Sequence, residues 1–433
     1  MGHHKRQKSP EEKVLDLLKE VPEKIVHKFL GKPHNLPHAA FTILYDEPKS
    51  ANEVMGSKEG CRGLFSPYDQ NIYIHGGRGI KAITKLEIYN PMKNQFAQAS
   101  NPCPTGIYNH SLVQYKNLLV AYGGQSTLPG IAQSFTLKDL YTYDIDTGLW
   151  EQRKQNKLQR FGRRNHVAWV LGRFMVVYGG MNDFNKLLGE LIVYDLDRDE
   201  WVEKLRVKKG KLPSISHAQA ATVFYEQRQR QYIKNLYNIP GVEWHKIDHF
   251  ILEEGFYLFG GFLEGAYATN DLWILQPDLE NIKWKKAETQ GVPPEPRYQH
   301  AMTYYKKENS LLISGGRNDK VQAIYSDLYF LTLDTLSWVK IDCIRGQGSL
   351  ALADHQLLLF NETDFLIMGG VDPDYKLSNK ITMLTFQESR IWAYAHNKRP
   401  SIKKLASNGG GEASPKGQPA PPQFRLAATN SFL

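Results

Sequence analysis

The stretch Asn117–Gln125, NLLVAYGGQ, has the form of an apolar β-strand that ends in two glycines. Five other segments share this form: IYIHGGR at 72–78, FMVVYGGMN at 174–182, FYLFGGF at 256–262, LLISGGRN at 311–318 and FLIMGGV at 365–371. The first glycines of the six pairs are Gly76, Gly123, Gly179, Gly260, Gly315 and Gly369, at successive intervals of 47, 56, 81, 55 and 54 residues. Internal repetition of this kind predicts one structural unit that occurs six times.

Two further marks recur around the glycine pairs. A histidine precedes the first glycine by 13 to 15 residues in four units, at His110, His166, His300 and His355. An aromatic residue follows the first glycine by 20 to 27 residues in every unit, at Phe96, Trp150, Trp201, Trp284, Trp338 and Trp392. His217 precedes Gly260 by 43 residues, which predicts an insert of about 30 residues, near 226–250, in the fourth unit. Only the first unit lacks the histidine and has Gly63 in its place.

Each unit contains short stretches of alternating apolar and polar residues, which predict a four-stranded antiparallel sheet. The order of histidine, apolar strand, Gly-Gly, strand with Tyr-Asp and then tryptophan resembles the kelch repeat over about 61–395. The resemblance implies an all-β fold, a six-bladed kelch-type β-propeller in which stacked blades bury both faces of each sheet.

The recurring residues are therefore expected to build the scaffold. The glycine pair lets the chain leave the second strand with a positive φ, and the aromatic residues fill the space between blades. The five histidines lie one per blade, so they cannot converge on one ion, and we expect core histidines and no metal site.

Composition limits the function classes. No apolar run approaches the roughly 18 residues of a membrane span. The first residues lack the apolar stretch of a signal peptide. Cys61, Cys103 and Cys343 are an odd, scattered set, which indicates a reducing compartment. We therefore expect a cytoplasmic protein, with a cytoskeletal or ciliary location as the narrower hypothesis.

The two ends differ from the repeats. Ser9-Pro10-Glu11 is a helix start followed by an apolar stripe, so residues 1–38 are predicted to form a helical extension. The propeller is expected over 39–397, and the strand-like segment 39–46 can either pad the ring or close it. Residues 398–433 are rich in Gly, Pro and Ser and are expected to be disordered.

Function is expected in the loops, where the units differ. Loops between the second and third strands share one face with the links between blades. The first variable residues of these loops are the predicted partner-binding set: Arg78, Gln125, Met181, Asn182, Phe262, Arg317, Asn318 and Asp372. A mixed set of amides, arginines and apolar groups suits peptide recognition better than catalysis, although a solvated rim without a ligand is the competing interpretation.

Two links between blades carry a concentration of positive charge. Residues 153–164 and 204–211 contain eleven Lys and Arg and no acid, in a chain of net charge +9. We predict a docking patch centred on Arg163, Arg164, Lys208 and Lys209 for an acidic surface, such as tubulin tails or an acidic subunit. A solvated basic face is the alternative. Nucleic acid is a less favoured partner because no stacking aromatics interleave the basic runs.

These features favour a non-enzymatic protein-interaction scaffold, as a subunit of a cytoskeletal or ciliary assembly. A substrate receptor or adaptor of a ubiquitin ligase is the alternative. An enzyme built on a kelch propeller is less favoured, since the chain has no phosphate-binding glycine loop and no nucleophile elbow. No catalytic residue, cofactor, metal or membrane contact is expected.

Overall fold

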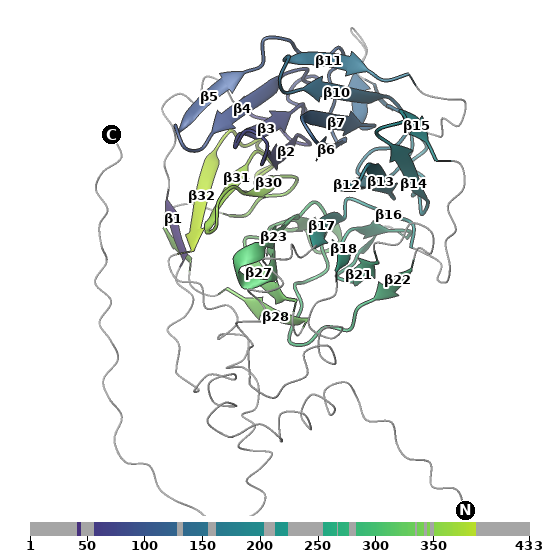
Figure 1. The fold of residues 1–433 in the computed structure, drawn as a ribbon. Helices are drawn as coiled ribbons and strands as arrows, with labels where there is room; N and C mark the ends of the chain where they lie inside the picture. Colours follow the sequence, from purple (N-terminus) through teal and green to yellow (C-terminus); the bar gives the residue numbers. More distant parts are fainter. Residues whose placement is uncertain are drawn as a thin grey trace, which may run out of the picture.

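The computed structural model describes residues 41–44, 56–127, 133–154, 162–202, 213–223, 254–265, 267–276, 283–333, 336–341, 344–346 and 350–386. Six β-sheets follow one another around a ring (Figure 1). The first strand of each sheet neighbours the first strand of the next, and β30 of the last sheet neighbours β2 of the first, which closes the ring. The all-β propeller with six blades is therefore confirmed.

Each of blades 1 to 5 is an antiparallel sheet whose strands run in chain order from the axis outward. Blade 1 contains β2 (Arg62–Phe65), β3 (Ile72–His75), β4 (Leu86–Asn90) and β5 (Gln95–Gln98). Blade 2 contains β6 (Ser111–Tyr115), β7 (Leu118–Tyr122), β10 (Leu140–Asp144) and β11 (Leu149–Gln152). Blade 3 contains β12 (Val167–Leu171), β13 (Phe174–Tyr178), β14 (Leu191–Asp195) and β15 (Glu200–Trp201).

The fourth and fifth blades repeat this order. Blade 4 contains β17 (Gln219–Val223), β18 (Gly255–Phe259), β21 (Leu272–Leu275) and β22 (Trp284–Lys286). Blade 5 contains β23 (Ala301–Tyr305), β24 (Ser310–Ser314), β27 (Leu328–Thr332) and β28 (Ser337–Lys340), with a 3₁₀ turn, η1 (Lys306–Glu308), in its first hairpin. The predicted insert near 226–250 joins the first two strands of blade 4 and lies outside the described residues.

The last blade answers which strand closes the ring. Its first three strands are β30 (Gln356–Leu359), β31 (Asp364–Met368) and β32 (Ile381–Phe386). The fourth place is taken by β1 (Phe41–Leu44), which pairs antiparallel with β32, and β29 (Ile344–Gly346) adds in parallel outside it. Trp392, the aromatic expected for this unit, lies outside the described residues, as do the predicted helical extension and tail.

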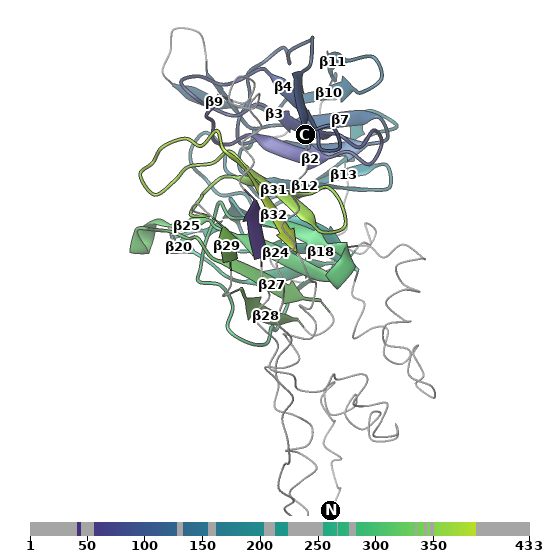
Figure 2. The same ribbon diagram turned by 90° about the vertical axis from the view of Figure 1, so that its left-hand side faces the viewer.

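The connections between second and third strands project from one face of the ring, which we call the loop face. Several are small hairpins: β8 (Gln125–Thr127) with β9 (Ser134–Thr136), β19 (Phe262–Leu263) with β20 (Tyr267–Ala268), and β25 (Arg317–Asn318) with β26 (Ala323–Ile324). β16 (Ile215–Ser216) extends the second hairpin, and a 3₁₀ turn, η2 (Asp319–Val321), tips the third. Figure 2 shows β9, β20 and β25 on the same side of the ring.

The glycine pairs join neighbouring blades. In every pair the second glycine N–H donates to a backbone carbonyl of the following blade, over 2.7–3.1 Å; the last of these bonds runs from Gly370 to Lys58 and closes the circle. The first glycine has a positive φ and faces the same carbonyl: a Cβ built on Gly123 would lie 2.7 Å from the Arg163 oxygen. A side chain at the first glycine would therefore push two blades apart, whereas one at the second glycine would collide with the inner strand of its own blade, as Gly180 would with Arg164 and His166.

The recurring aromatic residues also lie between blades, as predicted. Trp201 on β15 contacts Tyr122 of the preceding blade, with ring centroids 5.0 Å apart. Trp284 lies 5.0 Å from Tyr178, and Trp338 lies 4.9 Å from Phe259. In each pair the partner is the residue directly before the Gly-Gly, so the tryptophan of one repeat contacts the end of the second strand of the preceding repeat.

The repeat histidines are buried, and two of the sequence assignments need correction. Four of these histidines pack against the first glycine of the preceding blade, so closely that a Cβ added to that glycine would lie about 3 Å from the histidine Cε1. They are His110, His166, His300 and His355. In blade 4 the equivalent position is Ala218, because His217 lies one residue earlier. In blade 1 it is Cys61, not Gly63, and its Sγ faces Gly369 in the same way. The distance in sequence from the glycine pair varies between blades, so it could not show that these two positions were misassigned by one or two residues.

The buried histidines predict acid sensitivity. Burial lowers the pKa of His355 to about 4, from an ordinary 6.5. The folded state thus binds the proton less well than the unfolded chain, so stability is complete above about pH 6.5 and is lost as the pH falls toward 4. Each such histidine should cost about 1 kcal/mol per pH unit in this window. Urea unfolding of His355→Gln across the window should show a shallower slope, and an unchanged slope would contradict the assignment.

Candidate functional site

A ring of six left-handed residues surrounds the axis of the propeller. Each blade contributes one, directly before or near the start of its first strand, with φ between 53° and 64°. The six are Gly60, Asn109, Asn165, His217, Gln299 and Asp354. Five consecutive backbone hydrogen bonds of 2.8–3.1 Å join them, each from the N–H of one member to the carbonyl of the preceding member. The axis is thus lined by a fixed backbone ring with mostly polar side chains.

A rim of paired residues lies next to this ring. In each blade the residue before the left-handed position pairs with the residue after the glycine pair. The pairs are Glu59–Arg78, Tyr108–Gln125, Arg164–Met181, Ser216–Phe262, Tyr298–Arg317 and Ala353–Val371. The predicted residues Arg78, Gln125, Met181, Phe262 and Arg317 therefore occupy equivalent positions in five blades. The structure brings Arg164 into the same rim.

Two of the rim arginines are already paired with acids. Arg78 Nε donates to Glu59 over 3.0 Å, and its guanidinium lies 5.1 Å from the Tyr108 ring centroid. Arg317 donates to Asp319 over 2.7 Å and to the Tyr298 hydroxyl over 3.1 Å. Their charges are largely neutralised within the rim.

Arg164 is different. It donates to the Asn182 carbonyl over 3.0 Å and to the Asn185 amide oxygen, and no carboxylate among the described residues lies within ion-pair distance. Burial lowers its pKa, and the nearby charge of Asp183 acts against this shift. Next to it, burial together with the charges of Arg164, Arg62 and Arg317 lowers the pKa of His217 to about 3. The positive charges near His217 make this part of the loop face favourable for an added negative charge.

Three predicted residues have a local role. The side-chain oxygen of Asn182 accepts from the N–H groups of Phe184 and Lys186, both over 3.0 Å. Asp372 likewise accepts from the N–H groups two and four residues later, both over 2.9 Å. Asn318 accepts from Lys320 N–H and donates to the Pro296 carbonyl. These side chains shape their loops, and their role in partner binding stays a prediction.

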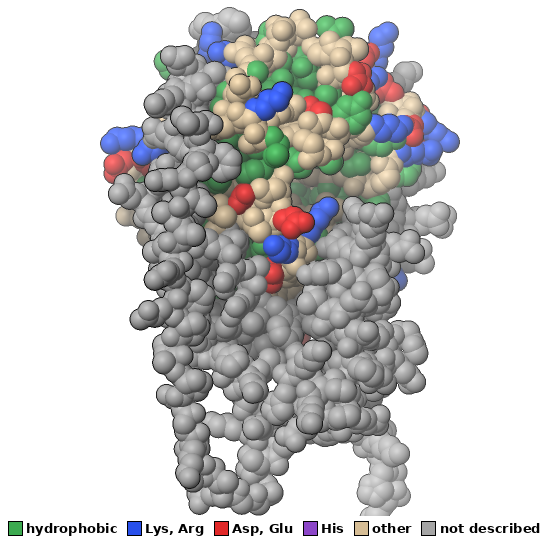
Figure 3. Space-filling model, turned by 60° about the vertical axis from the view of Figure 1, so that its left-hand side comes forward, with side chains coloured by type: hydrophobic (Ala, Val, Ile, Leu, Met, Phe, Trp, Pro, Cys, Tyr) green, Lys and Arg blue, Asp and Glu red, His purple; other side chains and the backbone are tan. Residues whose placement is uncertain are grey.

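The docking role predicted for Arg163 is wrong. Its side chain is fully buried, donates to the Gly179 carbonyl over 3.0 Å and forms an ion pair with Glu190 over 2.9 Å. A charge held in this way cannot be presented to a partner. Lys208 and Lys209 lie outside the described residues. On the visible surface in Figure 3, Lys and Arg side chains lie among Asp and Glu.

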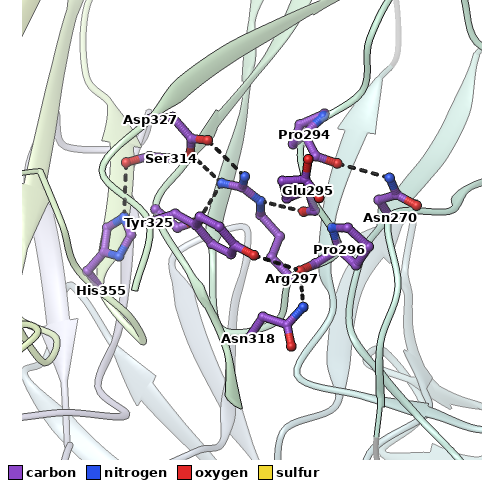
Figure 4. Close-up of polar contacts among 11 residues, drawn as sticks. Asn270, Pro294, Glu295, Pro296, Arg297, Ser314, Asn318, Tyr325, Asp327 and His355 are labelled. Atoms are coloured by element: carbon purple, nitrogen blue, oxygen red, sulfur yellow. Dashed lines mark hydrogen bonds and ion pairs between the residues drawn. The ribbon is translucent and has the colours of Figure 1, made fainter. Parts of the chain in front are cut away.

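Arg163 has a counterpart in blade 5. Arg297 is fully buried, donates to the Gly315 carbonyl over 2.9 Å and pairs with Asp327 through both guanidinium nitrogens (Figure 4). Its guanidinium also lies 4.2 Å from the Tyr325 ring centroid. Lys58, which pairs with Glu87, holds the equivalent position in blade 1. Blades 1, 3 and 5 thus each bury one cation that is paired with an acid of its own blade.

A set of exposed apolar side chains at the tips of the loop face was not predicted from the sequence. Five of the nine exposed large hydrophobic side chains among the described residues lie in connections between second and third strands. They are Ile80, Phe184, Tyr267, Val321 and Tyr375, each at least 48% exposed and each from a different blade. The signal in the sequence is one large apolar residue four to seven positions after each first glycine.

The polar side chains of the axial ring were missed as well. Asn165, only 4% exposed, has a side-chain oxygen with no hydrogen-bond partner in the described structure, and so do Asn109 and Gln299. Arg62 lies within 3.5 Å of Asp354, whose pKa is raised by burial. Only the backbone conformation reveals these positions as equivalent.

The fold and site define a six-bladed propeller with a loop-face mouth, and comparison with known proteins gives its family. Residues 43–232 and 246–407 match the KLHDC2/KLHL20/DRC7 Kelch-repeats domain. The chain therefore belongs to the kelch-repeat family, whose propellers generally mediate protein–protein interaction and are generally non-enzymatic. A solved structure titled "Structure of YjhT" has the same fold, with a TM-score of 0.57, 15% identity, and coverage of 77% of this chain and 97% of that chain.

Curated relatives share the repeats at modest identity. Acyl-CoA-binding domain-containing protein 4 of Arabidopsis thaliana is 27% identical over 280 residues, which are 64% of this chain and 35% of that protein. Human Kelch domain-containing protein 1 is 24% identical over 279 residues, 61% of this chain and 63% of that protein. Dynein regulatory complex subunit 7 of Chlamydomonas reinhardtii is 35% identical over 100 residues, 22% of this chain and 8% of that protein. The matched part of the chain thus spans 35%, 63% and 8% of the length of these three relatives.

Two negative findings apply to the described residues alone. Among them, no helix has the length and apolar character needed to cross a membrane. Within the same residues, no three side chains of His, Cys, Asp or Glu are grouped so that they could hold a metal ion.

Proposed function

We propose that this chain is a non-enzymatic interaction scaffold that binds an acidic protein partner on its loop face, as a subunit of a ciliary or cytoskeletal assembly. The observation that carries this proposal is Arg164, a half-buried rim arginine with no carboxylate of the described residues at ion-pair distance, on the same face of the ring as the exposed apolar tips. A partner carboxylate would restore the compensation that Arg164 lacks, and the apolar tips would supply contact area around it.

The exposed apolar tips come from five different blades, so a folded protein or a long peptide could contact several of them at once. A standard protein interface covers about 800 Å² on each side, and we expect a partner of this kind to reach that size. Tubulin tails or an acidic subunit of the same assembly match the required charge. The ciliary part is supported by the similarity to Dynein regulatory complex subunit 7, which covers 22% of this chain.

Charge reversal at the rim tests the proposal. Arg164→Glu should weaken capture of the partners retained by the full chain from ciliated cells by about tenfold or more, because like charges would meet at the anchor. Quantitative mass spectrometry of the captured proteins measures this loss. Arg198→Glu is the matched control, since Arg198 is 66% exposed in the β14–β15 turn of the same blade, away from the loop face.

Three outcomes decide the proposal. Loss of one acidic set of partners with Arg164→Glu alone supports it. If both variants capture the partners as well as the natural sequence does, Arg164 is not part of the interface. If both variants lose the partners equally, only the net charge of the chain matters. Captured partners without ciliary or cytoskeletal components would overturn the assembly assignment and leave the docking face intact.

A further inference from the structure

The outer strands of the six blades differ in how they are protected. An outer strand has unpaired backbone groups on one side, and natural sheets guard such edges with charge, cover or shortness. Among the described outer strands, β11 carries Glu151, β15 is two residues long with Glu200, β22 carries Lys285 and Lys286, and β29 carries Arg345. β28 carries Lys340 and is covered by Gln290, which pairs in parallel with Ser337.

Within the described part of the chain, β5 of blade 1 has none of these protections. Its residues are Gln95, Phe96, Ala97 and Gln98, with no charge and no proline, and all but Phe96 are exposed. It lies on the outer rim of the ring (Figure 1) and is the last strand of its sheet. It is the one outer strand of the described structure that contains no charged residue.

The backbone polarity of β5 follows from its pairing with β4. Ala99 N–H donates to the Leu86 carbonyl over 2.9 Å. Bonded and non-bonded pairs alternate along an antiparallel ladder, so Ala97 bonds to β4 and its neighbours do not. Phe96 and Gln98 therefore direct both their N–H and C=O groups away from the blade.

We propose that two copies of this chain associate through β5, antiparallel and related by a two-fold axis at Ala97. In this register Phe96 of each copy exchanges both backbone hydrogen bonds with Gln98 of the other. The four strands of each blade 1 then form one continuous eight-stranded sheet.

Symmetry makes a second copy the favoured occupant. A two-fold axis places each edge against its own sequence, so Glu151 of β11, or Lys285 and Lys286 of β22, would meet like charges. β5 avoids this repulsion. The small side chain of Ala97 lies at the axis, where two residues face each other most closely. The two Phe96 rings become diagonal neighbours on one sheet face, within the reach of aromatic side chains.

The pairing has a functional consequence that is independent of the proposed partner. β5 lies at the periphery of blade 1, so a dimer formed there leaves the mouth of each propeller free. The dimer would present two loop faces on one rigid body, which raises the avidity for a repetitive partner such as a filament.

The test measures the oligomeric state of the full chain. Sedimentation velocity over a concentration series should show a monomer–dimer equilibrium for the natural sequence. Gln98→Pro removes an N–H that does not bond to β4, so it should weaken the dimer about tenfold or more while the blade stays intact. Gln152→Pro is the matched control: in β11 the bond from Arg153 N–H to the Leu140 carbonyl gives Gln152 the same outward register.

A pair of oppositely charged variants at Ala97 tests the proposal even if the proline variant fails to fold. Ala97→Lys and Ala97→Glu should each be monomeric, because like charges meet at the axis, and an equimolar mixture should form a heterodimer. Restoration of the dimer in the mixture is the expected result. A natural sequence that stays monomeric at every concentration, a dimer equally weakened by Gln152→Pro, or no heterodimer in the mixture would each overturn the proposal.

Discussion

Replacing Gly179 by alanine is expected to lower the free energy of unfolding by about 4 kcal/mol. Gly179 has a φ of 72°, and a Cβ there would lie 2.5 Å from the Ile215 carbonyl oxygen. That carbonyl accepts the hydrogen bond from Gly180 that joins blades 3 and 4. The methyl group would impose backbone strain, overpack the junction and break this bond. Urea unfolding at neutral pH measures the loss.

Gly172 offers a control within the same blade. Its φ is 58°, so alanine there meets the same kind of backbone strain, but nothing lies within 4 Å of the added Cβ. Gly172→Ala should therefore cost only about 1–2 kcal/mol. Equal losses in the two variants would mean that backbone conformation alone explains the glycine pair and that close contact between blades does not.

Replacing Trp201 by alanine should cost about 3–5 kcal/mol. The indole is 7% exposed and lies between Tyr122 of blade 2 and Tyr194 of blade 3, with ring centroids 5.0 Å away in both cases. Its removal leaves a cavity at the junction of two sheets, and neither sheet can collapse into it without moving the glycine contacts nearby. Thermal and urea unfolding would both record the loss.

An exposed apolar residue serves as the control for Trp201. Leu149, on the outer strand of blade 2, is 57% exposed, so Leu149→Ala should change the free energy of unfolding by less than about 0.5 kcal/mol. A loss below 1 kcal/mol for Trp201→Ala would contradict the packing of aromatics between blades, which the sequence spacing first indicated.

The six-bladed architecture could be predicted from the sequence because the glycine pair and the aromatic residue recur in every unit. Each glycine pair meets the same requirement, a positive φ and a close carbonyl, so every unit has glycine at these two positions. The tryptophans return for the same reason, since each fills an equivalent space against the residue before a Gly-Gly. Six equivalent constraints give six equivalent sequence signals.

The site was harder to predict because its residues are defined by backbone conformation and burial. Arg163 and Arg164 are adjacent in a basic run, yet one is fully buried against Glu190 and the other faces the mouth. His217 has the residue type of the repeat histidines but holds a ring position one residue earlier. A pattern of residue types cannot distinguish such neighbours, and the free edge of β5 becomes visible only when the pairing of every outer strand is known.

The placement of β1 in the last blade has a consequence for biosynthesis. Its partner β32 begins at Ile381, about 340 residues after Leu44, so translation at about 5–20 residues per second separates the two strands by roughly 20–70 s. Blades 1 to 5 can assemble on the ribosome in the order of synthesis. The pairing that closes the ring waits until β32 (Ile381–Phe386) has been synthesised, and until then β1 must be shielded from other nascent chains.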